Sequence, residues 1–288
     1  MVKPLAKHSA PNHPARCFFL LIVFLLSAPN AFAQILRIHF MDVGYGDAIL
    51  IEFPGNHAML IDAGGRETSA RTIAYVRGRG ITRVDTAVMT HPHQNHFEGF
   101  FDVLAQFPVG RLYFNGESRG EEGVEKILEE FKRRNVPINA VKRGERLGDI
   151  VAPAEMVVLN PHDLTGSPNA DSMALWLRFG QQAFLFLADI EDKQFREIIE
   201  QFPFVKEADV VQIPHHGGLA SETSETLREN FRKKIFVIST GPNKWGIPAE
   251  EDLGQLEGHV LRTDRDGTII IETDGRRLSG KDGESLAF

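Results

Sequence analysis

Residues 90–96 read Thr90-His91-Pro92-His93-Gln94-Asn95-His96, and they follow directly on the apolar run Val84–Met89. The length and composition of that run predict a buried strand, so the histidines are expected on the loop at its end. In such a loop His91 and His93 can point to the same side, and His96 can turn back toward a neighbouring point. A lone histidine would fit a solvated loop, but three within residues 91–96 favour a site for one or two divalent metal ions.

A second histidine cluster, Pro214-His215-His216-Gly217-Gly218, also follows a run with the character of a buried strand, Val210–Ile213. Two histidine clusters that each follow a predicted strand indicate that several loops converge on one centre. The sequence leaves open whether His215 or His216 is the metal ligand.

Asp189 ends a third apolar run, Phe184–Ala188, which lies between the two clusters in the sequence. An aspartate at this place could instead cap the helix that is predicted to start near Glu191. In the company of five histidines, a carboxylate that bridges two ions is the favoured interpretation.

The rest of the chain alternates short β-rich runs with amphipathic helices and contains no repeat or linker. This pattern predicts an α/β fold in which two sheets pack together with helices outside them. A single domain is expected over residues 34–288.

The first 33 residues have the pattern of a secretory signal peptide. Basic residues precede the apolar run Cys17–Leu26, and Ala31-Phe32-Ala33 closes the segment. Cleavage after Ala33 would leave Gln34 as the mature start of an exported protein, periplasmic or secreted, without stable membrane association. An uncleaved anchor is the alternative, although the apolar run is shorter than the ~20 residues of a spanning helix. The one cysteine, Cys17, lies in this segment, so no disulfide or thiolate ligand is expected after cleavage.

The formal charge of the chain is −7, from 32 basic and 39 acidic side chains. Without the predicted signal peptide, which holds three of the basic residues and no acidic one, 29 basic and 39 acidic side chains give −10. Such a field does not attract a polyanion. Net charge therefore does not support nucleic acid as a partner, although bound divalent ions can reverse the local sign.

Taken together, these motifs resemble the metallo-β-lactamase superfamily and, within it, the hydrolase domain of ComEC-type DNA-uptake competence proteins. The resemblance covers nearly all of residues 36–274 and implies the αββα sandwich of that fold. The matching segments, in chain order, are Phe40–Ala48, Leu60–Gly65, His91–His96, Asn169 with Ser172, Asp189, Pro214–Gly217, and Arg262–Asp264 with Gly267.

The resemblance also implies roles for individual residues. His91 and His93 would hold one ion, His96 and His216 a second, with Asp189 between them. Asp62 would hydrogen-bond the loop that carries the first histidines, as metal ligands generally require, and Asp47 could do the same. Asn169 and Ser172 would support the ligands, and His215 would support them or contact the substrate. Zinc is the expected ion and manganese the alternative.

Two positions depart from the family pattern. The family's motif is His-x-His-x-Asp-His, and its aspartate normally binds the second metal and orients the attacking water. Asn95 stands there in this chain, and a neutral amide is a poorer ligand, so the second site is predicted to be weak or differently occupied. Ile247 stands before Pro248 where the family has histidine, which removes a polar group that could hold or protonate a substrate.

The predicted function is an exported metal-dependent hydrolase that acts through a metal-bound hydroxide. The resemblance favours a phosphodiester or small-molecule substrate and a nuclease-like activity, with Asp189, His215 and Asn95 as the catalytic candidates. One alternative is a non-catalytic binding protein that keeps the fold with a degraded second metal site. Another is a β-lactam or lactone hydrolase, but residues 169–172 lack the extra metal histidine of such enzymes.

Overall fold

The computed structural model describes residues 1, 34–118, 123–148, 150, 152–248, 250–281 and 283–286. The predicted signal peptide lies outside these residues, except for Met1. Residues Ala33–Phe288 form a compact unit. Among the described helices, none is both long and apolar enough to cross a membrane.

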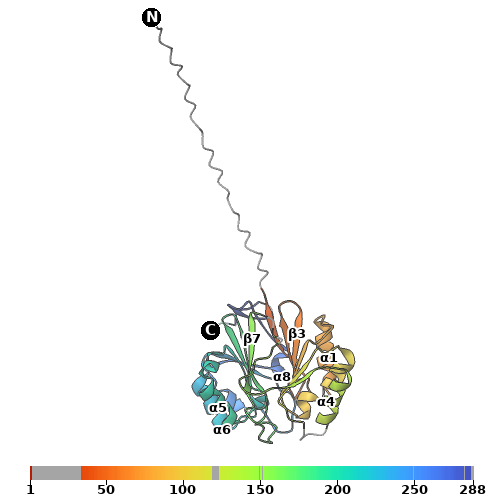
Figure 1. Cartoon of the computed structure of the whole chain (residues 1–288). Coiled ribbons are helices and arrows are strands. Elements are labelled where there is room, and N and C mark those ends of the chain that lie inside the picture. Colours follow the sequence, from red (N-terminus) through yellow and green to blue (C-terminus); the bar gives the residue numbers. More distant parts are fainter. Residues whose placement is uncertain are drawn as a thin grey trace. The chain divides into compact units, whose positions relative to one another are not determined.

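Two sheets form the centre of this unit (Figure 1). The eight-stranded sheet has the order β14 (Leu278–Gly280), β13 (Ile269–Thr273), β1 (Leu36–Phe40), β2 (Ile49–Phe53), β3 (His57–Ile61), β4 (Thr86–Met89), β5 (Leu112–Phe114), β6 (Ile138–Ala140). The six-stranded sheet has the order β12 (Gly258–Arg262), β11 (Lys234–Ile238), β10 (Val210–Gln212), β9 (Gln182–Phe186), β8 (Ala174–Phe179), β7 (Ala154–Asn160).

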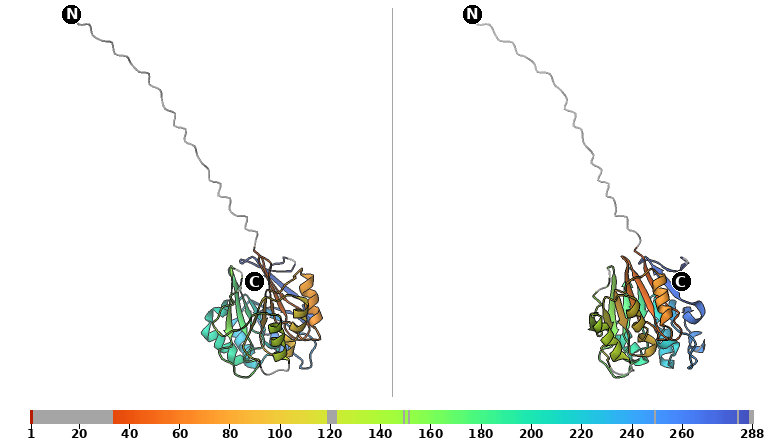
Figure 2. Two further views of the ribbon diagram at one scale, coloured as in Figure 1. Left: turned by 45° about the vertical axis from the view of Figure 1, so that its right-hand side comes forward. Right: turned by 90° about the vertical axis from the view of Figure 1, so that its right-hand side faces the viewer.

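Helices cover the outer face of each sheet (Figure 1; Figure 2). The eight-stranded sheet packs against α1 (Ser69–Gly78), α3 (Phe100–Gln106) and α4 (Val124–Arg133). The six-stranded sheet packs against α5 (Asp192–Gln201) and α6 (Ser221–Asn230). The remaining helical turns are α2 (Gln94–Phe97), η1 (Pro203–Glu207), η2 (His215–Gly217), α7 (Glu250–Leu253) and α8 (Thr263–Asp266). The predicted α/β fold with two sheets and outer helices is confirmed.

Alternation of side chains along the strands explains the layers. Leu36, Ile38 and Phe40 of β1 point into the core between the sheets. Strand β4 is buried on both faces, because Val88 joins that core while Ala87 and Met89 join the core beneath the helices. Its near-continuous apolar sequence follows from this double burial.

The structure divides one predicted helix. The sequence predicts a single helix over Phe97–Gln106, but α2 ends at Phe97 and α3 begins at Phe100. Gly99 lies between them, and its backbone N–H donates to the carbonyl of Gly64 at 2.9 Å. This close approach ties the segment that carries the first histidines to the end of β3.

Gly99→Ala is expected to lower the free energy of unfolding by about 1–3 kcal/mol, the usual effect of overpacking. A Cβ atom at this position would lie 2.0 Å from the carbonyl oxygen of Ala63, so the backbone must shift. Urea denaturation measures the change. Gly78→Ala in α1 is the matched control, because a Cβ atom there meets nothing within 4 Å. Equal stability of the Gly99 variant and wild type would contradict the expectation.

Candidate metal centre

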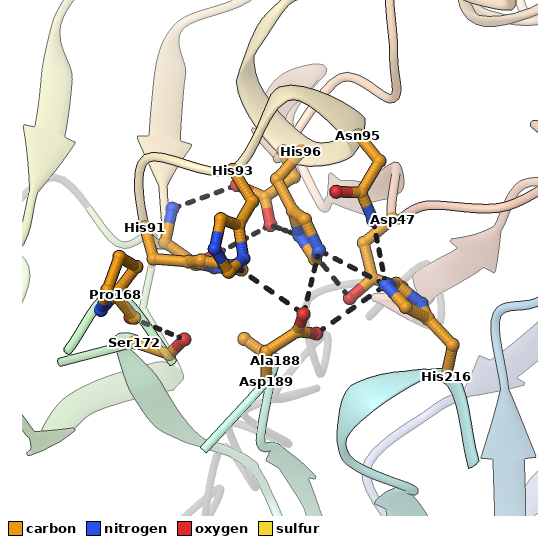
Figure 3. A network of polar contacts seen from close by, with 12 residues as sticks. Asp47, His91, His93, Asn95, His96, Pro168, Ser172, Ala188, Asp189 and His216 are labelled. Carbon is orange, nitrogen blue, oxygen red and sulfur yellow. Dashed lines mark hydrogen bonds and ion pairs between the residues drawn. The ribbon is translucent and has the colours of Figure 1, made fainter. Parts of the chain in front are cut away.

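Three segments meet where strands of the two sheets end (Figure 3). His91 and His93 follow β4, and His96 lies in the short helix α2. Asp189 follows β9 and His216 follows β10, both in the other sheet. The loops after strands of both sheets therefore converge on one centre.

The converging side chains form two groups that share one carboxylate. One group is Asp47, His96, Asp189 and His216, and the other is His91, His93 and Asp189. Within each group, one ligand atom from every residue lies within 4.8 Å of the others. Asp189 Oδ2 lies 3.5 Å from His91 Nε2 and 3.4 Å from His96 Nε2, and Asp189 Oδ1 lies 3.6 Å from His216 Nε2.

The hydrogen bonds of two histidines fix which nitrogen carries the proton. His96 Nδ1 donates to Asp62 Oδ2 at 2.8 Å, and His216 Nδ1 donates to the carbonyl of Ser239 at 2.9 Å. When these imidazoles are neutral, both Nε2 atoms carry lone pairs, and these two atoms lie 3.2 Å apart. Two lone pairs at this distance repel each other unless a cation, either a metal ion or a proton, lies between them.

Asp189 supplies the negative charge that such a cation needs. Its side chain is buried, and Oδ1 has no hydrogen-bond partner among the described residues. Burial alone would raise the pKa of Asp189, but His96, His216 and His91 lower it well below its usual value. Burial also lowers the pKa of His91 to about 3, which keeps the imidazole in its neutral, metal-binding form. The donor set fits divalent ions such as zinc.

Comparison with known proteins supports this assignment. The model of the metallo-beta-lactamase superfamily matches residues 41–241. The chain belongs to the metallo-beta-lactamase superfamily. The chain is 28% identical over 270 residues to ComE operon protein 3 of Bacillus subtilis (strain 168), a match that covers 86% of this chain and 34% of that protein. It is 23% identical over 234 residues to competence protein ComA of Neisseria gonorrhoeae, covering 79% of this chain and 31% of that protein.

These matches confirm the resemblance to ComEC-type competence proteins. The chain spans about one third of the length of these two relatives. Two solved structures share the superfamily fold. Unliganded yeast PDE1 has a TM-score of 0.55 at 9% identity, covering 82% of this chain and 99% of that chain. A diphosphatase of the PhnP family has a TM-score of 0.51 at 17% identity, covering 83% of this chain and 98% of that chain.

Asp62 orients ligands of both groups. Besides the proton of His96, this buried carboxylate accepts the Thr90 hydroxyl at 2.6 Å and the Thr90 backbone N–H at 2.8 Å. The Thr90 oxygen in turn lies 3.0 Å from His91 Nδ1. Because Thr90 Oγ1 donates to Asp62, it accepts from His91 Nδ1, and His91 Nε2 is left to face Asp189. The family resemblance implied a contact of this kind for Asp62.

Asp62→Asn is expected to lower metal affinity by about 10–100-fold, the usual effect of losing a hydrogen-bond partner of the ligands. The asparagine side chain has the same shape, but one of the two carboxylate oxygens becomes an NH₂ group, which cannot accept a hydrogen bond. One set of the contacts from Thr90 and His96 is therefore lost. Zinc titration of the metal-free protein measures the affinity. Asp171→Asn is the matched control, because Asp171 is equally buried but accepts from Thr165 and Gly166. Equal affinity losses in the two variants would contradict the assigned role.

Asp47 acts with a residue that the sequence analysis missed, Gln212. Asp47 Oδ2 accepts from Gln212 Nε2 at 2.8 Å. Gln212 Oε1 accepts the backbone N–H groups of Leu187 and Ala188 at 3.2 and 3.3 Å. This chain of contacts positions the turn that carries Asp189. The available signal was a buried glutamine within the apolar run Val210–Ile213.

The other predicted site residues lie around the two groups. Asn95 Nδ2 lies 2.9 Å from His216 Nε2, so its amide faces the ligands. His215 belongs to neither group, and its backbone N–H donates to Ala188. The Ser172 hydroxyl donates to the carbonyl of Pro168 at 3.4 Å (Figure 3). Asn169 accepts the Ser172 backbone N–H at its carbonyl.

A pocket of about 630 Å³ opens beside the ligands. Asp189, His93 and Asn95 line its polar side, and Tyr45, Trp245 and Ile247 are among the residues of its apolar side. A pocket of about 720 Å³ elsewhere in the chain includes Asp209, Lys233 and Arg276, and its described lining contains no histidine. The smaller pocket is the substrate-site candidate, because it alone of these two adjoins the ligand groups.

Proposed function

We propose that this protein is a metal-dependent phosphodiester hydrolase. One observation carries the proposal: two groups of ligand atoms share the buried carboxylate of Asp189. Divalent ions held by the two groups would be neighbours, and paired ions are the arrangement that catalyses displacement at phosphorus. The resemblance to DNA-uptake competence proteins directs the proposal toward phosphodiesters of nucleic acid type.

Residues of this chain would hold the ions and the substrate. His91 and His93 would bind one ion, His96 and His216 the other, and Asp189 would contact both. When bound, such ions supply Lewis-acid chemistry, making water more nucleophilic and offsetting charge on phosphoryl oxygens. Asp62 and Thr90 keep the imidazoles oriented. His215 lies on the pocket wall, where its ring would donate a hydrogen bond to a phosphoryl oxygen.

A substrate panel tests this function. The protein, loaded with zinc or manganese, is assayed on bis(p-nitrophenyl) phosphate, a DNA oligonucleotide and a chromogenic β-lactam. We expect cleavage of the phosphodiesters and little cleavage of the β-lactam. Preferential β-lactam hydrolysis would overturn the proposal.

A non-catalytic binding protein is the second candidate, because Asn95 places an amide where the family has a metal-binding carboxylate. Metal binding without turnover of any panel substrate would favour this candidate.

We further propose that the chain is exported and that Gln34 is the mature start of one domain. The pattern of residues 1–33 supports this proposal. Mass spectrometry of the protein recovered from its native host should find the chain starting at Gln34 outside the cytosol. An intact Met1 in protein that fractionates wholly with the cytosol would refute it.

A further inference from the structure

The side chain of Trp245 is exposed at the mouth of the candidate substrate pocket. Its relative exposure is 58%, compared with 42% for Leu164 and 39% for Phe204. The indole lies 4.7 Å from the ring of Tyr45, and the Tyr45 ring lies 4.5 Å from that of His216 (centroid distances). An aromatic row therefore leads from the surface to a proposed metal ligand.

Hydrogen bonds hold the loop that carries Trp245. Asn243 Nδ2 donates to the carbonyls of Gly241 and Ile247 at 2.9 and 2.6 Å. Asn243 Oδ1 accepts the backbone N–H groups of Trp245 and Ile247 at 3.0 and 3.3 Å. One side chain thus closes the loop with four hydrogen bonds, which hold the backbone that carries the indole.

The loop also docks closely on the segment that carries Tyr45. A Cβ atom at Gly241 would lie 2.5 Å from the carbonyl carbon of Gly44 and 2.8 Å from the backbone nitrogen of Tyr45. Only glycine permits this approach. The backbone segments that carry the two aromatic side chains are therefore held close together.

The chemistry of this wall favours a flat apolar group that is attached to a phosphate. Leu219 and Ile247 continue the apolar lining, and the one carboxylate among the described lining residues, Asp189, belongs to the proposed metal ligands. Lys244 Nζ lies 5.0 Å from the centroid of the indole and provides a positive charge beside the platform. An aromatic surface with an adjacent cation is how proteins bind the bases and backbone of single-stranded nucleic acid.

We propose that Trp245 and Tyr45 form a stacking platform for the nucleobase of a nucleoside phosphodiester. This inference rests on the proposed function, because the phosphate of the substrate would lie at the ligand groups. Lys244 would then contact a phosphate that flanks the stacked base. A glycerol or alkyl phosphodiester lacks the flat ring and would gain nothing from the platform.

Binding of two product-like phosphates tests the platform without turnover. Thymidine 5′-monophosphate carries a base, and 2-deoxyribose 5-phosphate does not. Calorimetry on the zinc-loaded full chain should show tighter binding of the nucleotide by about 10–100-fold, the range for one stacked base. Trp245→Ala should remove this preference and leave binding of the sugar phosphate unchanged. Trp245→Phe should keep most of it, since a ring remains.

Tryptophan fluorescence gives a second, independent readout. The chain has two tryptophans, and the other, Trp176, is buried at 6% exposure. The nucleotide should quench the fluorescence of wild type, and Trp245→Phe should lose the quenching while it still binds. Leu164→Ala is the matched control, because it removes an exposed apolar side chain that does not line the pocket.

Two outcomes would overturn the platform. One is equal binding of the two phosphates by wild type. The other is an unchanged preference in Trp245→Ala; if this variant weakens binding of both phosphates equally, Trp245 only anchors its loop on Tyr45. Phosphodiester hydrolysis without base preference would overturn the platform alone. Base-dependent binding without hydrolysis of any phosphodiester would overturn the proposed function alone.

Discussion

Asp189→Ala is expected to remove both bound metal and phosphodiester hydrolysis while the fold remains. Asp189 is the carboxylate that both ligand groups share. Losing a mere hydrogen-bond partner of metal ligands lowers affinity or activity about 10–100-fold, so losing this ligand should lower activity by at least about 100-fold. Hydrolysis of bis(p-nitrophenyl) phosphate measures the activity, elemental analysis the metal content, and circular dichroism the fold.

Two further variants test whether the loss is specific to the proposed ligands. His93→Ala should also lose activity and metal, because His93 belongs to the group with His91 and Asp189. His162→Ala should change neither, because that imidazole is exposed and pairs with Asp163. Full activity in the Asp189 or His93 variant would show that the catalytic centre lies elsewhere.

Asn95→Asp is expected to tighten the binding of the ion held by His96, His216 and Asp189. The Asn95 amide already contacts His216 Nε2, so a carboxylate in its place would present a charged oxygen to the same group. An added charged ligand strengthens binding by on the order of 1–3 kcal/mol, up to about a hundredfold. Wild type should therefore hold nearer one ion and the variant nearer two, and hydrolysis should rise if the second ion limits the rate.

Titration of the metal-free protein with zinc or manganese measures this difference. Asn95→Ala is the control, because it removes the amide without adding a charge and should not tighten the second ion. Two tightly bound ions in wild type would show that the Asn95 substitution matters less than we expect.

The fold was predictable because its signals are local. Runs with the character of buried strands that are closely followed by histidine, such as Val84–Met89 and Val210–Ile213, predict strands with candidate metal ligands on the loops after them. The sequence also placed His91, His93, His96 and Asp189 in one centre, and the structure brings their side chains together.

Contacts between residues far apart in the chain could not be predicted from local sequence patterns. Gln212 contacts Asp47 across 165 positions, and its function depends on packing of the two sheets. The position of His216 depends on the carbonyl of Ser239, which accepts from His216 Nδ1, so that Nε2 faces Asp189. The exposure of Trp245 depends on the hydrogen bonds of Asn243, which sequence periodicity does not reveal.

Metal reconstitution tests the central claim most directly. The protein is stripped with a chelator, titrated with zinc or manganese, and assayed on bis(p-nitrophenyl) phosphate at each step. A metal-dependent phosphodiester hydrolase should be inactive when stripped and should regain activity in proportion to the ions bound. Hydrolysis that persists without metal, or no hydrolysis at any ion load, would contradict this account.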